Sequence, residues 1–146
     1  MKHKIIHTGS IFIIITAVLV FLVGYAVDNE AERLEDLGYI GTASISFEYG
    51  ISPKETFANF PIREGWYVED LLNTLSSEKN IGIVSKSFGE DIGLFIESIN
   101  GVGQDESDGK WWQFWVNGEY SNQGVSNTPV HDGDFIEFKY TDNRYE

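Results

Sequence analysis

The stretch YVEDLLNTLSSEKN, residues 67–80, decides the fold, because here a strand-like alternation gives way to a helical period. Its apolar residues recur at positions i, i+3, i+4 and i+7 and so share one helical face: Val68, Leu71, Leu72 and Leu75. Glu69 and Asp70 suit the positive amino end of a helix, and Asn80 and Gly82 mark its carboxyl-terminal end. The pattern predicts one amphipathic helix that buries its leucine face.

Strand signals lie on both sides of this helix. Before it, ASISFEYG (43–50) alternates apolar and polar residues, and ETFANFPI (55–62) reads as a second strand. After it we expect strands within 81–89, 93–101, 111–120 and 130–141, with a hairpin turn at Asn117-Gly118 and another turn over 131–134. A mixed sheet wrapped around one helix is the economical packing for this order, which predicts an α+β fold.

The strand at 111–116, WWQFWV, holds three of the four tryptophans of the chain. Side chains alternate between the two faces of a strand. Trp112 and Phe114 therefore share an apolar face that we expect to pack on the helix, while Trp111, Gln113 and Trp115 share the other. Two tryptophans beside an amide on an outward face would form a platform for a flat ligand. The alternative is that both faces are covered and the aromatic residues only stabilise the sheet.

The amino end carries a membrane signal. Lys2 and Lys4 precede an uncharged apolar run over 11–27, and acidic residues follow from Asp28. At about 1.5 Å per residue the run spans roughly 25 Å, near the short end for a bilayer crossing. The flanking charges place the amino end in the cytoplasm. We expect residues 1–27 to form a transmembrane signal anchor, or else a signal peptide cleaved after Gly24-Tyr25-Ala26, in which case the domain is secreted.

The rest of the chain divides into a spacer and one compact unit. Residues 28–41 are expected to be a juxtamembrane spacer, in which Ala31, Leu34 and Gly38 share a helical face that continues the anchor helix. Gly38 and Gly41 are expected to end that helix. Residues 42–146 are expected to form a single domain outside the cytoplasm.

Composition restricts the partners of that domain. The chain has a formal net charge of −13, and the part after Val27 holds 8 basic and 23 acidic residues, hence 8 − 23 = −15. Such a field repels nucleic acid and anionic lipid surfaces. The chain has no cysteine, which excludes disulfides, thiolate metal sites and thiol catalysis.

Two further motifs are weak as sites. His131 lies in His131-Asp132-Gly133-Asp134, where a turn alone explains the aspartates and the glycine. The acidic run at 104–108, QDESD, lacks the ligand spacing of an EF-hand and reads as a solvated loop. The sequence shows no nucleophile motif, no set of metal ligands and no phosphate-binding loop, so it predicts neither an enzyme nor a bound cofactor.

Three segments carry a family resemblance: SFG…GLFIESING, WWQFWVNGEYSNQGV and VHDGDFIEFKY. Together they resemble the transcobalamin-like C-terminal domain, also called DUF4430, over roughly residues 42–141. The resemblance implies a β-grasp-like fold, a sheet that grips one helix. In the vitamin B12 carriers intrinsic factor and transcobalamin, such a domain closes over cobalamin held by a separate α-helical barrel.

By this resemblance, the ligand-binding residues are those of the aromatic strand and of one glycine-containing turn: Trp111, Trp112, Gln113, Phe114, Trp115, Gly124, Val125 and Ser126. The implied function is a membrane-anchored, extracytoplasmic module that binds a corrinoid-like small molecule, with cobalamin as the candidate ligand and a separate partner domain. The alternative is a cell-surface structural domain or a domain that binds another surface protein.

Overall fold

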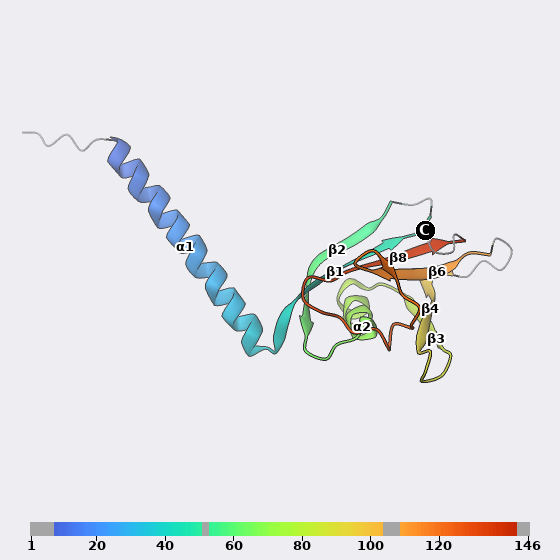
Figure 1. Cartoon of the computed structure of the whole chain (residues 1–146). Helices are drawn as coiled ribbons and strands as arrows, with labels where there is room; N and C mark the ends of the chain where they lie inside the picture. The colour runs from blue at the N-terminus through green and yellow to red at the C-terminus, as the bar shows by residue number, and fades with distance from the viewer. Residues whose placement is uncertain (1–7, 51–52, 104–108, 143–146) are drawn as a thin grey trace, which may run out of the picture. The chain divides into compact units, whose positions relative to one another are not determined.

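The structure is a computed structural model of the whole chain, and it describes residues 8–50, 53–103 and 109–142. The chain divides into two compact units, Met1–Gly38 and Tyr39–Glu146 (Figure 1). The segment expected as a spacer, 28–41, is shared between the end of a helix, a turn and the start of the first strand.

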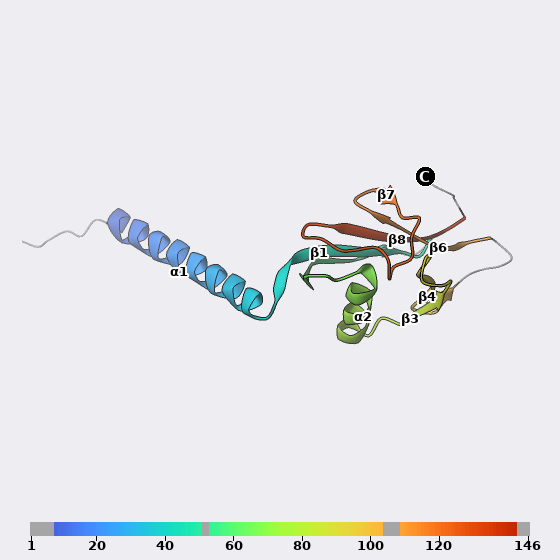
Figure 2. The same cartoon turned by 60° about the horizontal axis from the view of Figure 1, so that its bottom comes forward.

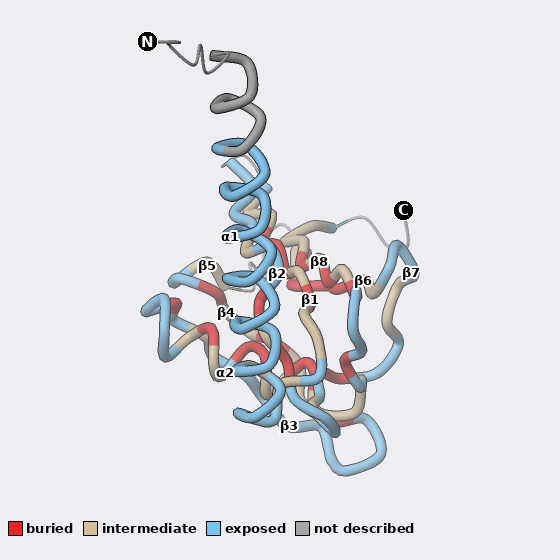
Figure 3. The backbone as a smooth tube through the Cα atoms, turned by 90° about the vertical axis from the view of Figure 1, so that its left-hand side faces the viewer, coloured by how far each residue is buried: buried red, intermediate tan, exposed pale blue. Residues whose placement is uncertain are grey.

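The first unit is the helix α1, Thr8–Asp36, whose described side chains are all exposed (Figure 3). The helix ends where the glycine predicts it, because Gly38 adopts a φ of 79° and its N–H donates to the Glu35 carbonyl at 2.8 Å. Of the residues that the structure describes, no helix is both long and apolar enough to cross a membrane. The helix is therefore confirmed, and the transmembrane crossing expected over 11–27 is not. The side chains that the structure describes in α1 begin at Ile15, so the described part of the apolar run extends from Ile15 to the residue before the acidic Asp28.

The second unit is built on a five-stranded sheet with the order β2-β1-β8-β6-β7. Its strands are β1 Tyr39–Glu48, β2 Glu55–Arg63, β6 Trp111–Val116, β7 Glu119–Tyr120 and β8 Phe135–Thr141. The central pair β1·β8 is parallel and the other pairs are antiparallel, so the sheet is mixed, as the sequence predicts. Figure 2 shows the sheet edge-on, with the helix α2 below it.

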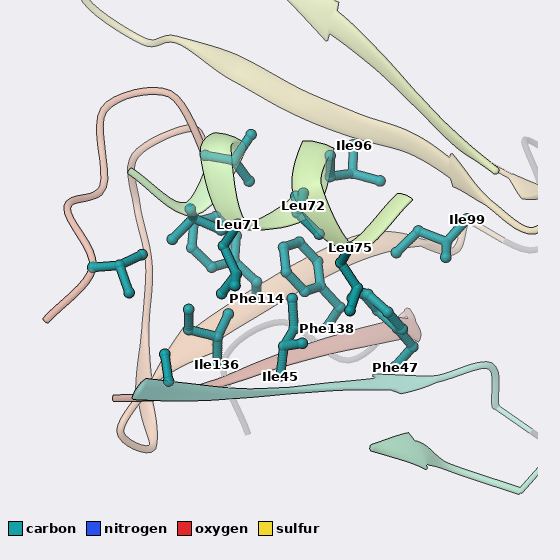
Figure 4. Close-up of a cluster of buried hydrophobic side chains, with 14 of the residues drawn as sticks. Ile45, Phe47, Leu71, Leu72, Leu75, Ile96, Ile99, Phe114, Ile136 and Phe138 are labelled. Atoms are coloured by element: carbon teal, nitrogen blue, oxygen red, sulfur yellow. The ribbon is translucent and has the colours of Figure 1, made fainter. Parts of the chain in front are cut away.

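The helix α2, Val68–Lys79, covers one face of this sheet. Its first turn is capped by Asp70, whose Oδ2 accepts a hydrogen bond from the Tyr67 N–H at 2.9 Å. Asn80 ends it in the left-handed conformation, with a φ of 57°. Figure 4 shows the leucines of α2 directed at the sheet, among the side chains of Ile45, Phe47, Phe114, Ile136 and Phe138. The predicted helix and its buried face are confirmed.

The remaining strands form a second, smaller sheet, where the sequence suggested a single one. The strands β3 Ile83–Ser87, β4 Leu94–Ile99 and β5 Val102–Gly103 pair antiparallel in the order β3-β4-β5. Ile96 and Ile99 of β4 belong to the same core as the leucines of α2 (Figure 4). The fold is thus α+β, with one core shared by α2 and two sheets.

Candidate functional site

The aromatic strand β6 lies inside the five-stranded sheet. It pairs with β8 from Trp111 to Val116, and its last two residues also pair with β7. Its two faces are therefore presented to different surroundings: one to α2 and the core, the other to the side of the sheet away from the helix.

The face toward α2 is core, as the sequence predicts. Trp112 and Phe114 are buried, and the Phe114 ring stacks on Phe138 with centroids 5.1 Å apart. The Trp112 indole N–H donates to the Val102 carbonyl at 2.8 Å, so the polar atom of this buried ring is satisfied. These two side chains hold β6 against the core and the small sheet.

The other face is covered, which corrects the prediction of an exposed platform. Trp115 is only 5% exposed, the same fraction as Trp112. The Lys139 ammonium lies 4.4 Å from the Trp115 ring centroid, and Tyr120 meets the ring edge-on with centroids 5.6 Å apart. Trp111 is half-buried. The exposed platform expected of Trp111 and Trp115 is therefore absent, because the Lys139 side chain covers the flat face of Trp115.

Gln113, between the two tryptophans, is buried as well. It is 3% exposed, and its Nε2 donates to the Thr141 carbonyl of β8 at 3.3 Å. Its cross-strand partner is Lys139, the residue that covers Trp115. The amide therefore acts as a cross-strand contact within the sheet and does not reach an open surface.

The same covered face continues onto β1. Lys54 forms an ion pair with Glu137 at 2.7 Å, and its ammonium also lies 5.2 Å from the Phe135 ring centroid. Ser46, opposite Glu137 in the sheet, is fully buried, and its Oγ has no hydrogen-bond partner. Long side chains thus cover the sheet on the side away from α2.

The turn at Gly124, Val125 and Ser126 packs on the start of β4. The N–H groups of Gly124 and Val125 donate to the carbonyls of Ile92 and Leu94, both at 2.8 Å. Ser126 Oγ accepts from the Leu94 N–H at 3.0 Å. Val125 belongs to the core, and its carbonyl accepts from the Glu69 N–H at the start of α2. This turn therefore joins β4 to α2 and does not form the rim of a tryptophan platform.

An open pocket of about 440 Å³ lies beside the end of β6. It is bounded by the β6–β7 hairpin and by the chain that follows it, and its lining is Val116, Asn117, Glu119, Tyr120, Ser121 and Thr128. The hairpin is the one that the Asn-Gly turn predicts, with Asn117 at a φ of 53° and Gly118 at 83°. The sequence thus located the turn, while the pocket depends on the return of residues 121–128 past the hairpin, which no local pattern reveals.

The walls of this pocket have hydrogen-bonding groups and one aromatic ring. Ser121 Oγ and Thr128 Oγ1 lie 3.3 Å apart and join the two sides. Asn117 is fixed, since its Nδ2 donates to Asp134 at 2.7 Å and its Oδ1 accepts from the Phe135 N–H at 2.9 Å. The Ser121 hydroxyl is also bonded to the Gln123 backbone, and the Thr128 hydroxyl donates to the Gly124 carbonyl. Hydrogen bonding to a polar, flat molecule therefore depends on the exposed Glu119 carboxylate, beside the Tyr120 ring.

The histidine turn is structural, as expected. The Asp134 carboxylate accepts from the His131 backbone N–H at 2.8 Å and lies 3.5 Å from its ring Nδ1. Over the described ranges, no three His, Asp or Glu side chains are grouped to hold a metal ion. The acidic run at 104–108 lies outside the described residues.

Comparison with known proteins places this chain within a family of domains. A family model described as "Domain of unknown function (DUF4430)" matches residues 65–142, more than half of the chain. This range includes α2, the three strands of the small sheet, the aromatic strand β6 and the residues that line the pocket. No curated protein matches the chain.

Two solved structures have a similar fold. A candidate metal-binding protein from Ruminococcus gnavus ATCC 29149 matches with a TM-score of 0.54 and 24% identity, over 72% of this chain and 100% of that chain. Haptocorrin in complex with Cbi matches with a TM-score of 0.59 and 18% identity, over 73% of this chain and 25% of the haptocorrin chain. At these identities the likeness shows a shared fold and nothing more.

Proposed function

The chain belongs to the DUF4430 family, and we propose that its compact unit is a non-catalytic module that binds a small molecule. The observation that carries the proposal is the pocket beside the β6–β7 hairpin. Its volume of about 440 Å³ falls within the roughly 300–1,000 Å³ of small-molecule sites. In the chain, the pocket lining begins at Val116, directly after the tryptophans of the aromatic strand, and ends at Thr128, two residues after the turn at 124–126, but the residues implied by the family resemblance do not line it.

The proposed ligand is flat, polar and corrinoid-like, with cobalamin as the first candidate. The Tyr120 ring offers a surface for stacking, while the Glu119 carboxylate offers hydrogen bonds. Because the pocket is open on one side, we propose that a separate partner domain covers the rest of the ligand. The likeness to haptocorrin supports this arrangement, since the shared fold makes up only 25% of that chain.

A binding experiment with cyanocobalamin tests this function. The full chain is incubated with cyanocobalamin and passed through gel filtration, and the cobalamin absorbance that elutes with the protein is measured. Glu119→Arg puts a longer, oppositely charged side chain into the pocket wall and should reduce retained cobalamin about tenfold. Glu64→Arg makes the same change at an exposed site outside the pocket and should leave retention unchanged. Equal losses in both variants, or no retention by the parent chain, would reject the proposal.

We also propose that the amino-terminal segment anchors the domain outside the cytoplasm. The support is the sequence itself: two lysines, an uncharged apolar run over 11–27 and acidic residues after it. The chain should then stay with membranes after a carbonate wash, and its carboxyl end should be open to protease added outside the cell. A soluble, shortened product that begins near Val27 would show a cleaved leader and a secreted domain instead.

One observation favours a second candidate function. Trp115 and Gln113, two residues of the expected site, are buried by the protein's own side chains. This burial supports a cell-surface domain whose aromatic strand is purely structural and which binds another protein. Absence of cobalamin retention, together with an intact fold, would favour this candidate.

A further inference from the structure

The free edge of the small sheet exposes apolar side chains. Among the strands that the structure describes, β3 pairs with β4 only, so no described strand lies beside the backbone groups on its other side. Every residue of β3 after Ile83 is exposed, including Val84 at 52%. Just beyond the strand, Phe88 is 53% exposed and Ile92 49% exposed. These residues, with Lys86, form what we call the β3 surface: Val84, Lys86, Phe88 and Ile92.

The β3 surface is held in place from behind. The Phe88 ring meets Phe95 of β4 edge-on, with centroids 5.5 Å apart, and the Phe88 N–H donates to the Gly93 carbonyl at 3.1 Å. The Lys86 ammonium lies 5.6 Å from the Phe88 ring centroid. The turn at 90–94 is in turn bonded to the loop at 124–127, where Asn127 Nδ2 donates to the Glu90 carbonyl at 2.8 Å. The exposed ring is thus presented by a fixed scaffold.

The edges of the five-stranded sheet differ from β3. On β2, Asn59 has a φ of 53° close to a shift in register, and Pro61 removes a backbone donor. β2 has no large apolar residue among its exposed positions. The other edge strand, β7, is only two residues long. Such features discourage strand pairing, and of the edges that the structure describes, β3 is the one that combines free backbone groups with exposed apolar side chains.

The charges around β3 indicate what kind of segment can pair there. Glu90 and Asp91 are exposed in the turn after the strand, and Glu97 faces Lys86 at 3.7 Å. The whole chain carries a net charge of −13. Because Lys86 is paired with Glu97, the exposed Glu90 and Asp91 dominate the charge beside the β3 surface. A second copy would bring like charges together and be repelled, whereas a basic segment would be attracted.

We propose that the β3 surface binds an extended, basic segment of another protein, which adds to the small sheet as a fourth strand. Backbone hydrogen bonds from the free edge of β3 would provide the pairing, as in other strand-addition complexes. Alternate apolar side chains of the segment pack against Val84 and Phe88, and its lysines or arginines lie near Glu90 and Asp91. The shift in register between Val84 and Ser85 limits the paired stretch to a short one.

A pair of capped peptides tests this inference on the full chain. One peptide alternates valine and lysine, and the other alternates valine and glutamate. Fluorescence anisotropy should show the basic peptide binding at least about tenfold more tightly than the acidic one, and the difference should shrink at high salt. Hydrogen exchange of the complex should slow at the amides of 83–88 and not at those of β2.

Matched variants locate the contact. Val84→Ser and Phe88→Ser should each weaken the basic peptide about tenfold, whereas Ile40→Ser, at a strand residue of similar exposure, should not change it. Unchanged melting temperatures confirm that the variants fold. Glu119→Arg, which tests the pocket, should leave peptide binding intact, so the two sites are separable. Equal binding of both peptides, no binding of the basic one, or self-association of the chain through β3 in light scattering would overturn the inference.

Discussion

At the scale of single residues, Trp115 is held by side chains from two neighbouring strands. Lys139 of β8 covers the flat face of its ring, and the Tyr120 ring of β7 packs against it in a T-shaped arrangement. Strand alternation correctly assigns Trp115 to the face away from α2. It does not reveal what covers that face, because Lys139 is distant in sequence and reaches Trp115 only through the pairing of β6 with β8.

Replacing this tryptophan should therefore destabilise the fold. Trp115→Ala is expected to lower the free energy of unfolding by about 3–5 kcal/mol, the usual cost of truncating a buried aromatic residue. Trp111→Ala, at a half-buried position of the same face, should cost clearly less. Urea denaturation followed by circular dichroism measures both. A Trp115→Ala chain as stable as the parent would mean that the ring is exposed in solution.

The phenol of Tyr49 predicts a loss of stability in alkali. Burial, and then a 2.7 Å hydrogen bond to the Glu55 carboxylate, raises the pKa of Tyr49 well above its ordinary value, against the opposing effect of a hydrogen bond from Asn100. Because the folded pKa is raised, the stabilising contribution is complete below the unfolded pKa of about 10 and is lost as the pH rises above it.

The corresponding measurement compares the parent chain with Tyr49→Phe. The free energy of unfolding of the parent should fall more steeply than that of the variant between about pH 9 and about pH 11. The difference between the two slopes isolates this phenol from the other tyrosines. Identical slopes would show that Tyr49 is not shielded from solvent in the folded state.

At the scale of elements, local periodicity was sufficient to locate the helix α2 and every strand of the compact unit except the two-residue β5, Val102–Gly103. The four apolar positions of α2 are buried as the helical spacing predicts, and the Asn117-Gly118 turn forms the expected hairpin. Periodicity could not separate the strands into two sheets, since the pairings β1·β8 and β3·β4 depend on contacts between distant segments. It also could not show that the loop over 121–128 closes one side of a pocket.

The close approach of that loop to β4 makes a prediction about Gly124. A Cβ at this position would lie 2.5 Å from the Leu94 carbonyl oxygen. Gly124→Ala should therefore destabilise the chain by about 1–3 kcal/mol, the typical cost of overpacking, and should also weaken ligand binding because the loop is displaced. Gly82→Ala is the control, since its nearest neighbour would be 3.9 Å away. Equal melting temperatures for the two variants would contradict this account of the turn.

At the scale of the whole molecule, two separate regions of the compact unit differ in the kind of partner that each can bind. The pocket beside the β6–β7 hairpin is proposed to receive a small molecule, and the β3 surface is proposed to receive a protein strand. The aromatic strand, which the sequence presents as the binding element, mainly stabilises the sheet through Trp112, Phe114 and Trp115.

The most direct test of the central claim is a residue-resolved titration of the isotope-labelled full chain with cyanocobalamin, followed by amide chemical shifts. The account predicts shifts that saturate and cluster at Val116–Ser121 and at Thr128, with little change at the amides of β2. The same titration of Glu119→Arg should show weaker shifts at the same positions. Shifts that are absent, that spread evenly over the surface, or that cluster away from the hairpin would contradict the assignment of the pocket as the ligand site.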